Sequence, residues 1–335
     1  MLELLESSPP VAFAVALVAT LLATPVVRLL AWRAGAVAKP DARRIHPEPI
    51  AQWGGVAIFF GVVMAALLWR QPTFADFRLL ALSSTPLAIE TARQTVHLST
   101  AFFGCGFLML MLGMADDRFE FRPHWKFLGQ ILIVLLLWSL GVRIQTLPFT
   151  AGTQPLSDPV SLLLTLGWVL GLTNAMNFID GVDGLASGLA AIGAASLAFI
   201  EAGKAPWAAA VAASLAGASL GFLRWNLPPA KIFLGDAGAL LLGFWLAVVS
   251  LAAASKTAAA TSLLLPMLVL GVPLFDTAWA VLRRTLAGKP FWSADRGHLH
   301  HRLLARGLTT PRVLLVLYSV ALVLGASAVA FNRIP

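Results

Sequence analysis

The chain has 335 residues, of which 59% are hydrophobic and only 12% are charged. A soluble domain of this length does not need so much apolar surface, so the composition excludes an ordinary soluble protein and indicates a membrane protein. The net charge of +8 would suit a nucleic-acid partner, but it has a topological explanation, and we expect no nucleic acid.

The apolar runs are continuous rather than alternating, which favours helices over a β-barrel, and each is long enough to cross about 30 Å of hydrocarbon. We predict an all-α polytopic integral membrane protein with about ten transmembrane helices, forming a single domain over residues 1–335. The predicted spans are roughly 10–31, 53–69, 98–114, 127–141, 159–173, 184–200, 206–223, 238–253, 259–282 and 313–331.

The basic residues predict how these spans are oriented. An even number of spans puts both termini on one side. Sixteen Lys and Arg residues fall in loops on the other side, seven fall on the side of the termini, and Arg28 lies inside the first span. By the positive-inside rule the side with sixteen is cytoplasmic, so both termini are predicted to be periplasmic or external. The polar clusters below all lie in cytoplasmic loops or at their edges, which favours a site facing the cytoplasm.

Two adjacent carboxylates, Asp116 and Asp117, follow the third span in GMADDRFEFRPHWK. Neighbouring carboxylates repel each other unless a cation or a proton intervenes, so the pair indicates a site for a metal or a phosphate. A solvated helix terminus is the alternative. The first cytoplasmic loop also carries Lys39, Arg43, Arg44 and His46, where a positive-inside anchor explains the charge as well as a substrate role does.

The loop NAMNFIDGVDGL contains four amide or acid side chains, Asn174, Asn177, Asp180 and Asp183, between two apolar spans. Asn and Asp donate to and accept from a nucleobase, a sugar or the water shell of a metal. An Asx-rich turn is the alternative, but a turn alone does not need four such side chains at this spacing.

Asp236 lies between two glycines in FLGDAGA, at the start of the eighth span. A carboxylate there is favourable through the helix dipole alone, which is the simplest interpretation. As a metal ligand it would need nearby oxygen donors, for which Asp116, Asp117 and phosphate oxygens are candidates. Hard oxygen ligands favour Mg²⁺ over Zn²⁺, and Mn²⁺ would be able to substitute.

The last cytoplasmic loop holds DRGHLHHRLLARG, with His298, His300 and His301 among arginines. Three histidines so close together suit zinc, but a diphosphate is the better match for so many cationic donors. A basic patch at the membrane surface is the alternative. Asp276 lies inside the ninth span, seven residues before Arg283. An intramembrane Asp is a functional candidate, with a hydrogen bond between helices as the alternative.

Taken in order, these blocks resemble the polyprenyl-phosphate N-acetylhexosamine-1-phosphate transferases, a superfamily that includes the phospho-MurNAc-pentapeptide translocase. The resemblance runs from about Gly35 to Leu315. The matching stretches are KPDARRIHPEPIAQWGG, GMADDRF, NAMNFIDGVDGLA, NLPPAKIFLGDAGA, PLFDT and DRGHLHHRLL. Each stretch alone is a weak signal, and together they are specific.

The resemblance implies an Mg²⁺-dependent enzyme of the bacterial inner membrane that transfers a sugar-1-phosphate from a UDP-sugar to undecaprenyl phosphate and releases UMP. It implies that Asp236 is the principal metal ligand, that Asp116 and Asp117 handle the lipid phosphate or the metal, and that the histidines contact the diphosphate. The amide and acid side chains expected on the nucleotide and metal side are Asn174, Asn177, Asp180, Asp183 and Asn226. The sequence leaves a homodimer open.

The histidine spacing HLHH resembles the UDP-GlcNAc enzymes more than the pentapeptide translocase, so we expect GlcNAc, with another UDP-N-acetyl sugar as the alternative. Two positions depart from the pattern: Glu120 replaces a frequent Asp and Ala239 replaces a usual Ser. A secondary transporter is the competing class, but it predicts broken segments in two related halves, which the sequence lacks. A non-catalytic scaffold would make Asp236 and the histidines replaceable.

Overall fold

The computed structural model describes residues 9–38, 48–68, 96–146, 155–254, 264–288 and 297–333, and it is mainly helical within these ranges. The helices are α2 (Pro9–Ala34), α3 (Gly54–Leu68), the short π-helix η1 (Ala101–Cys105), α6 (Gly106–Phe119), α7 (Pro123–Ser139), α8 (Asp158–Ile179), α9 (Leu185–Glu201), α10 (Pro206–Asn226), α11 (Gly235–Ala254), α12 (Leu264–Val269), α13 (Gly271–Leu286), α14 (Leu299–Ala305) and α15 (Thr310–Phe331).

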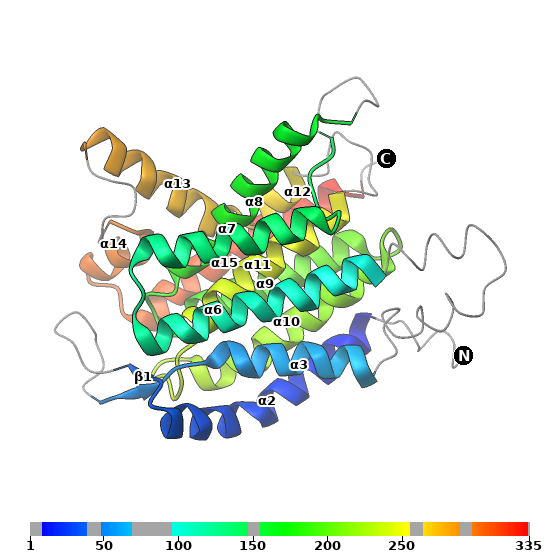
Figure 1. The fold of residues 1–335 in the computed structure, drawn as a ribbon. Coiled ribbons are helices and arrows are strands. Elements are labelled where there is room, and N and C mark those ends of the chain that lie inside the picture. Colours follow the sequence, from blue (N-terminus) through cyan, green and yellow to red (C-terminus); the bar gives the residue numbers. More distant parts are fainter. Residues whose placement is uncertain are drawn as a thin grey trace.

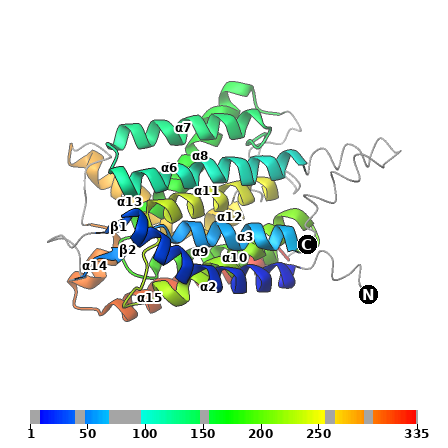
Figure 2. The ribbon, with the colours of Figure 1, turned by 60° about the horizontal axis from the view of Figure 1, so that its bottom comes forward.

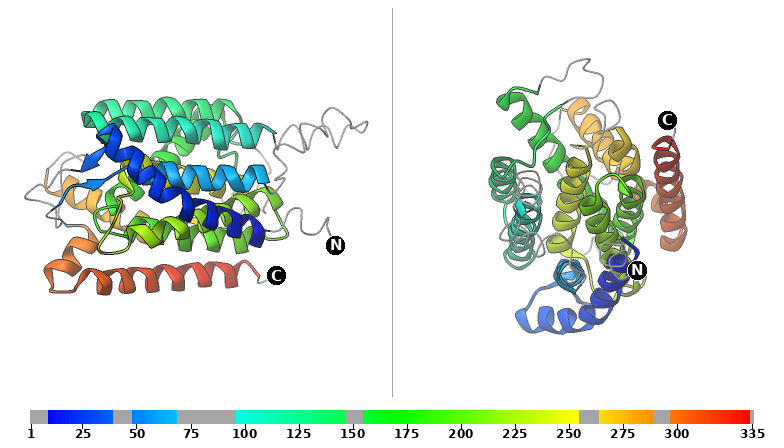
Figure 3. Two further views of the ribbon diagram at one scale, coloured as in Figure 1. Left: turned by 90° about the horizontal axis from the view of Figure 1, so that it is seen from below. Right: turned by 90° about the vertical axis from the view of Figure 1, so that its right-hand side faces the viewer.

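Most of the long helices run lengthwise through one bundle (Figures 1 and 2). The start of α2 and the end of α15 lie at one end of the bundle, and α14 lies at the other end (Figure 3). The buried apolar residues form one cluster that includes residues from Ala16 in α2 to Ala328 in α15. The polar residues discussed below therefore have an apolar bundle as their support.

The centre of the bundle is formed by helices whose residues are apolar or small on every side. The described side chains of α11 from Ala239 to Leu242 are fully buried, and α10 buries most of its alanines, serines and glycines. Small residues let helix backbones approach closely, which suits association in lipid, where the hydrophobic effect between helices is weak. Accordingly α10 packs on α2 and α9, and α11 packs on α6 and α8.

Each predicted span overlaps a helix. Among the residues that the structure describes, five helical segments, including Val96–Phe119, are long and apolar enough to cross a membrane, which agrees with a predominantly α-helical membrane protein. The predicted span over 259–282 covers two helices instead of one, α12 and α13, with Leu270 between them. The total of ten spans and the compartment that each end faces stay predictions.

Helix α13 differs from the others because it is amphipathic. Its buried residues include Val272, Asp276, Ala280 and Arg284, at every fourth position, while large apolar side chains such as Trp279 are exposed on the other side. The helix diverges from the bundle axis (Figure 1). Its buried stripe brings one carboxylate and one guanidinium toward α14.

A small β-hairpin forms hydrogen bonds with the segment before α11. Strand β1 (Val37–Ala38) pairs antiparallel with β2 (Ile50–Ala51). The Phe233 amide donates to the Ala51 carbonyl at 2.8 Å, and the Gly54 amide donates to the Phe233 carbonyl at 3.1 Å. These bonds fix the chain immediately before Asp236.

Candidate active site

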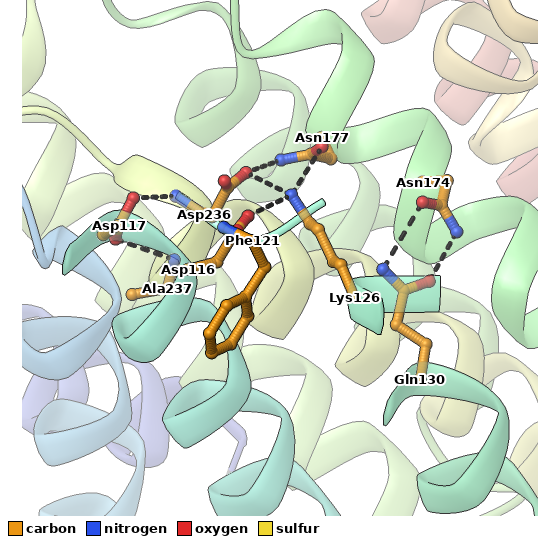
Figure 4. Close-up of polar contacts among 9 residues, drawn as sticks. All are labelled: Asp116, Asp117, Phe121, Lys126, Gln130, Asn174, Asn177, Asp236 and Ala237. Carbon is orange, nitrogen blue, oxygen red and sulfur yellow. Dashed lines mark hydrogen bonds and ion pairs between the residues drawn. The ribbon is translucent and has the colours of Figure 1, made fainter. Parts of the chain in front are cut away.

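Four helices bring polar side chains to one point. The ammonium Nζ of Lys126 on α7 lies 2.8 Å from Oδ2 of Asp116 on α6 and 2.8 Å from Oδ1 of Asp236 on α11. It also donates to Oδ1 of Asn177 on α8 at 3.4 Å, and the Asn177 amide donates to Asp236 (Figure 4). Three of the predicted site residues are thus brought together around one cation.

The two adjacent aspartates have different partners. Oδ1 of Asp116 accepts the Phe121 amide at 2.8 Å, which leaves its other oxygen for the ammonium. Asp117 is directed instead to the start of α11, where its two oxygens accept the backbone amides of Asp236 at 2.8 Å and Ala237 at 3.1 Å (Figure 4). Asp117 therefore does for α11 what an N-cap side chain does, satisfying amides in the first turn that have no partner within the helix.

Gly235 makes this capping possible. Its backbone has φ +69°, a left-handed conformation that glycine adopts without strain, and a Cβ there would lie 2.6 Å from Oδ2 of Asp117. The glycine before Asp236 is thus needed for backbone conformation and for space. The carboxylate of Asp236 is held in the first turn of α11 by a carboxylate from another helix.

The expectation that Asn174 and Asn177 lie in a loop is wrong. Helix α8 continues to Ile179, so both residues belong to its last turns and face α7. Asn174 exchanges hydrogen bonds with Gln130, of 2.7 Å and 3.4 Å, and Asn177 contacts Lys126. Residues three or four apart share one face of a helix. The two asparagines of α8 therefore face two side chains of α7, with Asn177 beside Lys126 and Asn174 beside Gln130.

Asp183 of the same motif and Asn226 at the end of α10 fix the loops around the site. Oδ2 of Asp183 accepts the Ala230 amide at 3.0 Å. Asn226 accepts from the Gly184 amide at 3.0 Å and from the Ser187 hydroxyl at 2.9 Å, and it donates to the Ile232 carbonyl at 3.0 Å. These contacts give Asp183 and Asn226 structural roles, and their predicted place beside a nucleotide stays a prediction.

Asp180 follows α8 directly and lies among other carboxylates. Desolvation raises its pKa well above the usual range, and the charges of Asp236, Asp117 and Asp183 raise it further. Several acidic groups at one site are mutually unfavourable, so a cation that offsets their charge stabilises them.

The histidine motif begins with a hydrogen-bonded pair. Nδ1 of His298 lies 2.9 Å from Oδ2 of Asp276, and the Leu299 amide donates to Oδ1 of Asp276 at 2.8 Å. Nη2 of Arg284 lies 3.5 Å from Nε2 of His298. Asp276 thus orients His298 and accepts the first backbone amide of α14. These two contacts favour a functional role for this aspartate over a simple hydrogen bond between helices.

The other two histidines, His300 and His301, lie next to this pair. The ring centroids of His298 and His300 are 5.8 Å apart, and those of His300 and His301 are 4.2 Å apart. Burial lowers the pKa of His300 to about 4, with the charge of His301 as the next cause, so His300 is neutral at pH 7. Its Nε2 atom lies close to Gly181, where a Cβ would approach to 2.7 Å, so the histidine motif adjoins the loop that carries Asp180.

The basic residues of the loop predicted to be the first on the cytoplasmic side, Lys39, Arg43, Arg44 and His46, lie outside the described residues. The site also contains side chains that were not predicted from the sequence, namely Lys126, Gln130 and Arg284. The signal for the first two was present, because a Lys and a Gln four residues apart, at the start of an apolar run, share one helix face.

The donor atoms fit Mg²⁺. Within the described ranges, no three acidic, His or Cys side chains are grouped so that they would hold a metal ion by themselves. Mg²⁺ is usually bound by one or two carboxylates, with water and substrate phosphates completing its shell. Asp116, Asp236 and Asn177 direct three oxygen atoms to one point, which suits that kind of site.

The sequence is similar to those of known proteins. The family model Glycosyl transferase family 4 matches residues 99–254, which include Lys126 and the three side chains around its ammonium. A Bacillus subtilis protein named as a probable undecaprenyl-phosphate N-acetylglucosaminyl 1-phosphate transferase is 34% identical over 325 residues, covering 96% of this chain and 84% of the relative. The chain belongs to glycosyl transferase family 4.

Two further relatives of this family 4 member have similar names. A decaprenyl-phosphate N-acetylglucosaminephosphotransferase of Mycobacterium tuberculosis is 36% identical over 345 aligned positions, covering 95% of this chain and 81% of the relative. An undecaprenyl-phosphate alpha-N-acetylglucosaminyl 1-phosphate transferase of Escherichia coli is 26% identical over 311 residues, covering 90% of this chain and 77% of the relative. The similarity therefore extends over nearly the whole chain.

Proposed function

We propose that this protein transfers GlcNAc-1-phosphate from UDP-GlcNAc to undecaprenyl phosphate in the inner membrane of a bacterium. The products are UMP and a lipid-linked sugar diphosphate, the first intermediate of a cell-surface polysaccharide. The names of the relatives support both the acceptor lipid and the sugar. Their names also favour GlcNAc over the other UDP-N-acetyl sugars that the sequence left open.

The observation that carries the proposal is the convergence of Asp116, Asp236 and Asn177 at one end of an apolar bundle. A lipid acceptor remains in the membrane while a UDP-sugar is soluble, so their reaction requires a polar site at the membrane boundary. A set of carboxylates at the ends of apolar helices, beside a histidine motif with a nearby guanidinium, meets that requirement.

In the reaction, an oxygen of the lipid phosphate forms a bond to the sugar-linked phosphorus of the UDP-sugar. The bond from that phosphorus to the oxygen bridging the two phosphates breaks, and UMP leaves with the electron pair. A phosphate monoester has a second pKa of about 6, so much of the acceptor is already a dianion at pH 7. The need for a general base is small, and positioning and charge compensation become the main tasks.

We assign those tasks to particular residues. Asp116, Asp236 and Asn177 would hold Mg²⁺, which when bound neutralises charge on the diphosphate. Asp117 keeps Asp236 in place through the start of α11. His298, oriented by Asp276, and Arg284 beside it would donate to phosphate oxygens, as charge-assisted donors do in other phosphate sites. His301 would contribute to the same contact.

The test is a transfer assay with the purified full chain, undecaprenyl phosphate, Mg²⁺ and a panel of UDP-sugars, measuring UMP release and lipid-linked product. We expect turnover with UDP-GlcNAc, loss of turnover with EDTA, and recovery with Mg²⁺ or Mn²⁺. Turnover with a different sugar alone would overturn the choice of donor. No turnover with any sugar, from protein that elutes as a folded species, would overturn the proposed reaction.

A further inference from the structure

We propose that Lys126 is an internal counter-ion whose ammonium occupies the metal site. The metal displaces this ammonium when it binds. The inference rests on the proposed function, because it concerns the metal that the function needs. It assigns Lys126 two successive partners: the carboxylates before the metal binds, and phosphate oxygens of the substrates afterwards. Lys126 would then limit the affinity for the metal while contributing to the transfer.

The position of the ammonium supports this assignment. Its contacts at 2.8 Å, 2.8 Å and 3.4 Å are with oxygens of the three residues that the donor chemistry selects for Mg²⁺. The oxygens come from α6, α11 and α8, and they meet at Nζ (Figure 4).

These contacts are not an ordinary surface ion pair. The side chain of Lys126 is 15% exposed, that of Asp116 is 7% exposed and that of Asp236 is 29% exposed. Ion pairs shielded from water are screened less than exposed pairs, so the interaction between the ammonium and the carboxylates is substantial. A cation that replaces the ammonium must therefore compete with it.

A divalent cation and the ammonium cannot share these oxygens. Mg²⁺ binds oxygen ligands at about 2.0–2.1 Å, so ligation by Asp116 and Asp236 would place it where Nζ lies now. Two cations in van der Waals contact repel strongly when they are shielded from water. The four-carbon stem of a lysine is flexible, so the ammonium has a low-cost route away from the carboxylates.

The displaced ammonium has a use in the reaction. Lys126 lies in the first turn of α7, which begins at Pro123, at the same end of the bundle as the carboxylates. A substrate diphosphate held by the metal would lie within its range, and an ammonium is a point charge that binds phosphate well. Metal binding would thus convert a counter-ion of the enzyme into a counter-ion of the substrate.

The competing interpretation is structural: Lys126 only joins α7 to α6 and α11. The two interpretations predict opposite changes in metal affinity when the charge is removed. If the lysine competes with the metal, a neutral side chain tightens metal binding. If the lysine only holds the carboxylates in place, a neutral side chain leaves metal binding unchanged or weakens it.

The experiment measures Mn²⁺ binding to the purified full chain by the loss of the free Mn²⁺ signal in electron paramagnetic resonance. The variants are Lys126→Met and Lys126→Gln, which remove the charge, and Lys126→Arg, which keeps it. Lys231→Met is the matched control, because it removes one positive charge predicted on the same membrane face from a side chain that lies over the Trp225 ring. Gel filtration shows whether each variant is folded.

We expect both neutral variants to bind Mn²⁺ at least about tenfold more tightly, a difference of about 1.4 kcal/mol, while their turnover with UDP-GlcNAc falls. Lys126→Arg and Lys231→Met should bind Mn²⁺ within about twofold of the wild type. The combination of tighter metal binding and slower transfer is not expected from a purely structural role.

Unchanged or weaker Mn²⁺ binding in either folded neutral variant would overturn the inference. If the wild type still released UMP from UDP-GlcNAc, the proposed function would stand without the displacement of Lys126. Conversely, tighter Mn²⁺ binding in the neutral variants of a protein that transfers no sugar phosphate would support the displacement and overturn the proposed reaction.

Discussion

The different partners of Asp116 and Asp117 lead to a test of how Asp236 is positioned. In Asp117→Asn, one carboxylate oxygen becomes an NH₂ group that faces a backbone N–H of the first turn of α11. The variant loses one of two hydrogen bonds, of 2.8 Å and 3.1 Å, and a negative charge at the start of the helix. Asp116→Asn is the matched variant, because its remaining carbonyl oxygen still accepts the Phe121 amide and the start of α11 is untouched.

The magnitude follows from these two losses. A hydrogen bond to a charged group contributes about 1.5–3 kcal/mol, and a negative charge at a helix N-terminus about 0.3–1 kcal/mol. We therefore expect Asp117→Asn to lower the free energy of unfolding by about 2–4 kcal/mol. Turnover should also fall about 100-fold, because a displacement of 1 Å at a reacting group has an effect of that size.

Thermal unfolding in detergent and UMP release measure the two effects. Asp117→Asn should unfold at a lower temperature than Asp116→Asn, while turnover should fall in both variants. Asp117→Glu keeps the charge and both oxygens, so it should recover part of the stability. Wild-type stability and turnover in Asp117→Asn would refute the capping role, as would a larger loss of stability in Asp116→Asn.

Three more predictions concern single side chains. Asp236→Asn should abolish turnover in a protein that still folds and inserts, and wild-type UMP release would contradict the metal assignment. Asp276→Asn weakens the hydrogen bond that orients His298 and should lower turnover about tenfold or more with little change in the Kd for Mn²⁺, since a carboxylate that orients a functional histidine commonly contributes about 10–100-fold; a changed Mn²⁺ affinity would place Asp276 in the metal site instead. Asn226→Leu removes the three hydrogen bonds to Gly184, Ser187 and Ile232 and should lower the free energy of unfolding by about 2–4 kcal/mol, measured by thermal unfolding, whereas an unchanged unfolding temperature would show that these bonds are dispensable.

The helices could be predicted from the sequence because each apolar run must satisfy its own backbone in lipid, and a helix does so locally. The ends of the helices were harder to predict. Asn174 and Asn177 were predicted to lie in a loop because hydropathy falls after Thr173, yet the helix continues to Ile179 since α7 supplies polar partners for both amides. A hydropathy pattern does not register hydrogen bonds between helices.

The sequence predicted several residues of the site but not how their side chains contact one another. Asp117 and the Asp236 amide are 119 positions apart along the chain, so no local spacing predicts that one caps the helix of the other. The adjacent aspartates look equivalent in the sequence, and only the packing of α6 against α11 gives them different partners. Lys126 lies among the predicted ligands for the same reason, because its position depends on where α7 meets three other helices.

The proposed function requires that Asp116, Asp236 and Asn177 together hold the metal on which transfer to the lipid depends. The most direct measurement is the incorporation of labelled GlcNAc from UDP-GlcNAc into undecaprenyl-linked product, with Mg²⁺ titrated against the wild type, Asp116→Asn and Asn177→Leu. We predict that the wild type makes the lipid product in proportion to bound Mg²⁺ and that both variants need more Mg²⁺ for half-maximal transfer. Equal Mg²⁺ requirements in all three proteins, or transfer that persists in excess EDTA, would contradict the claim.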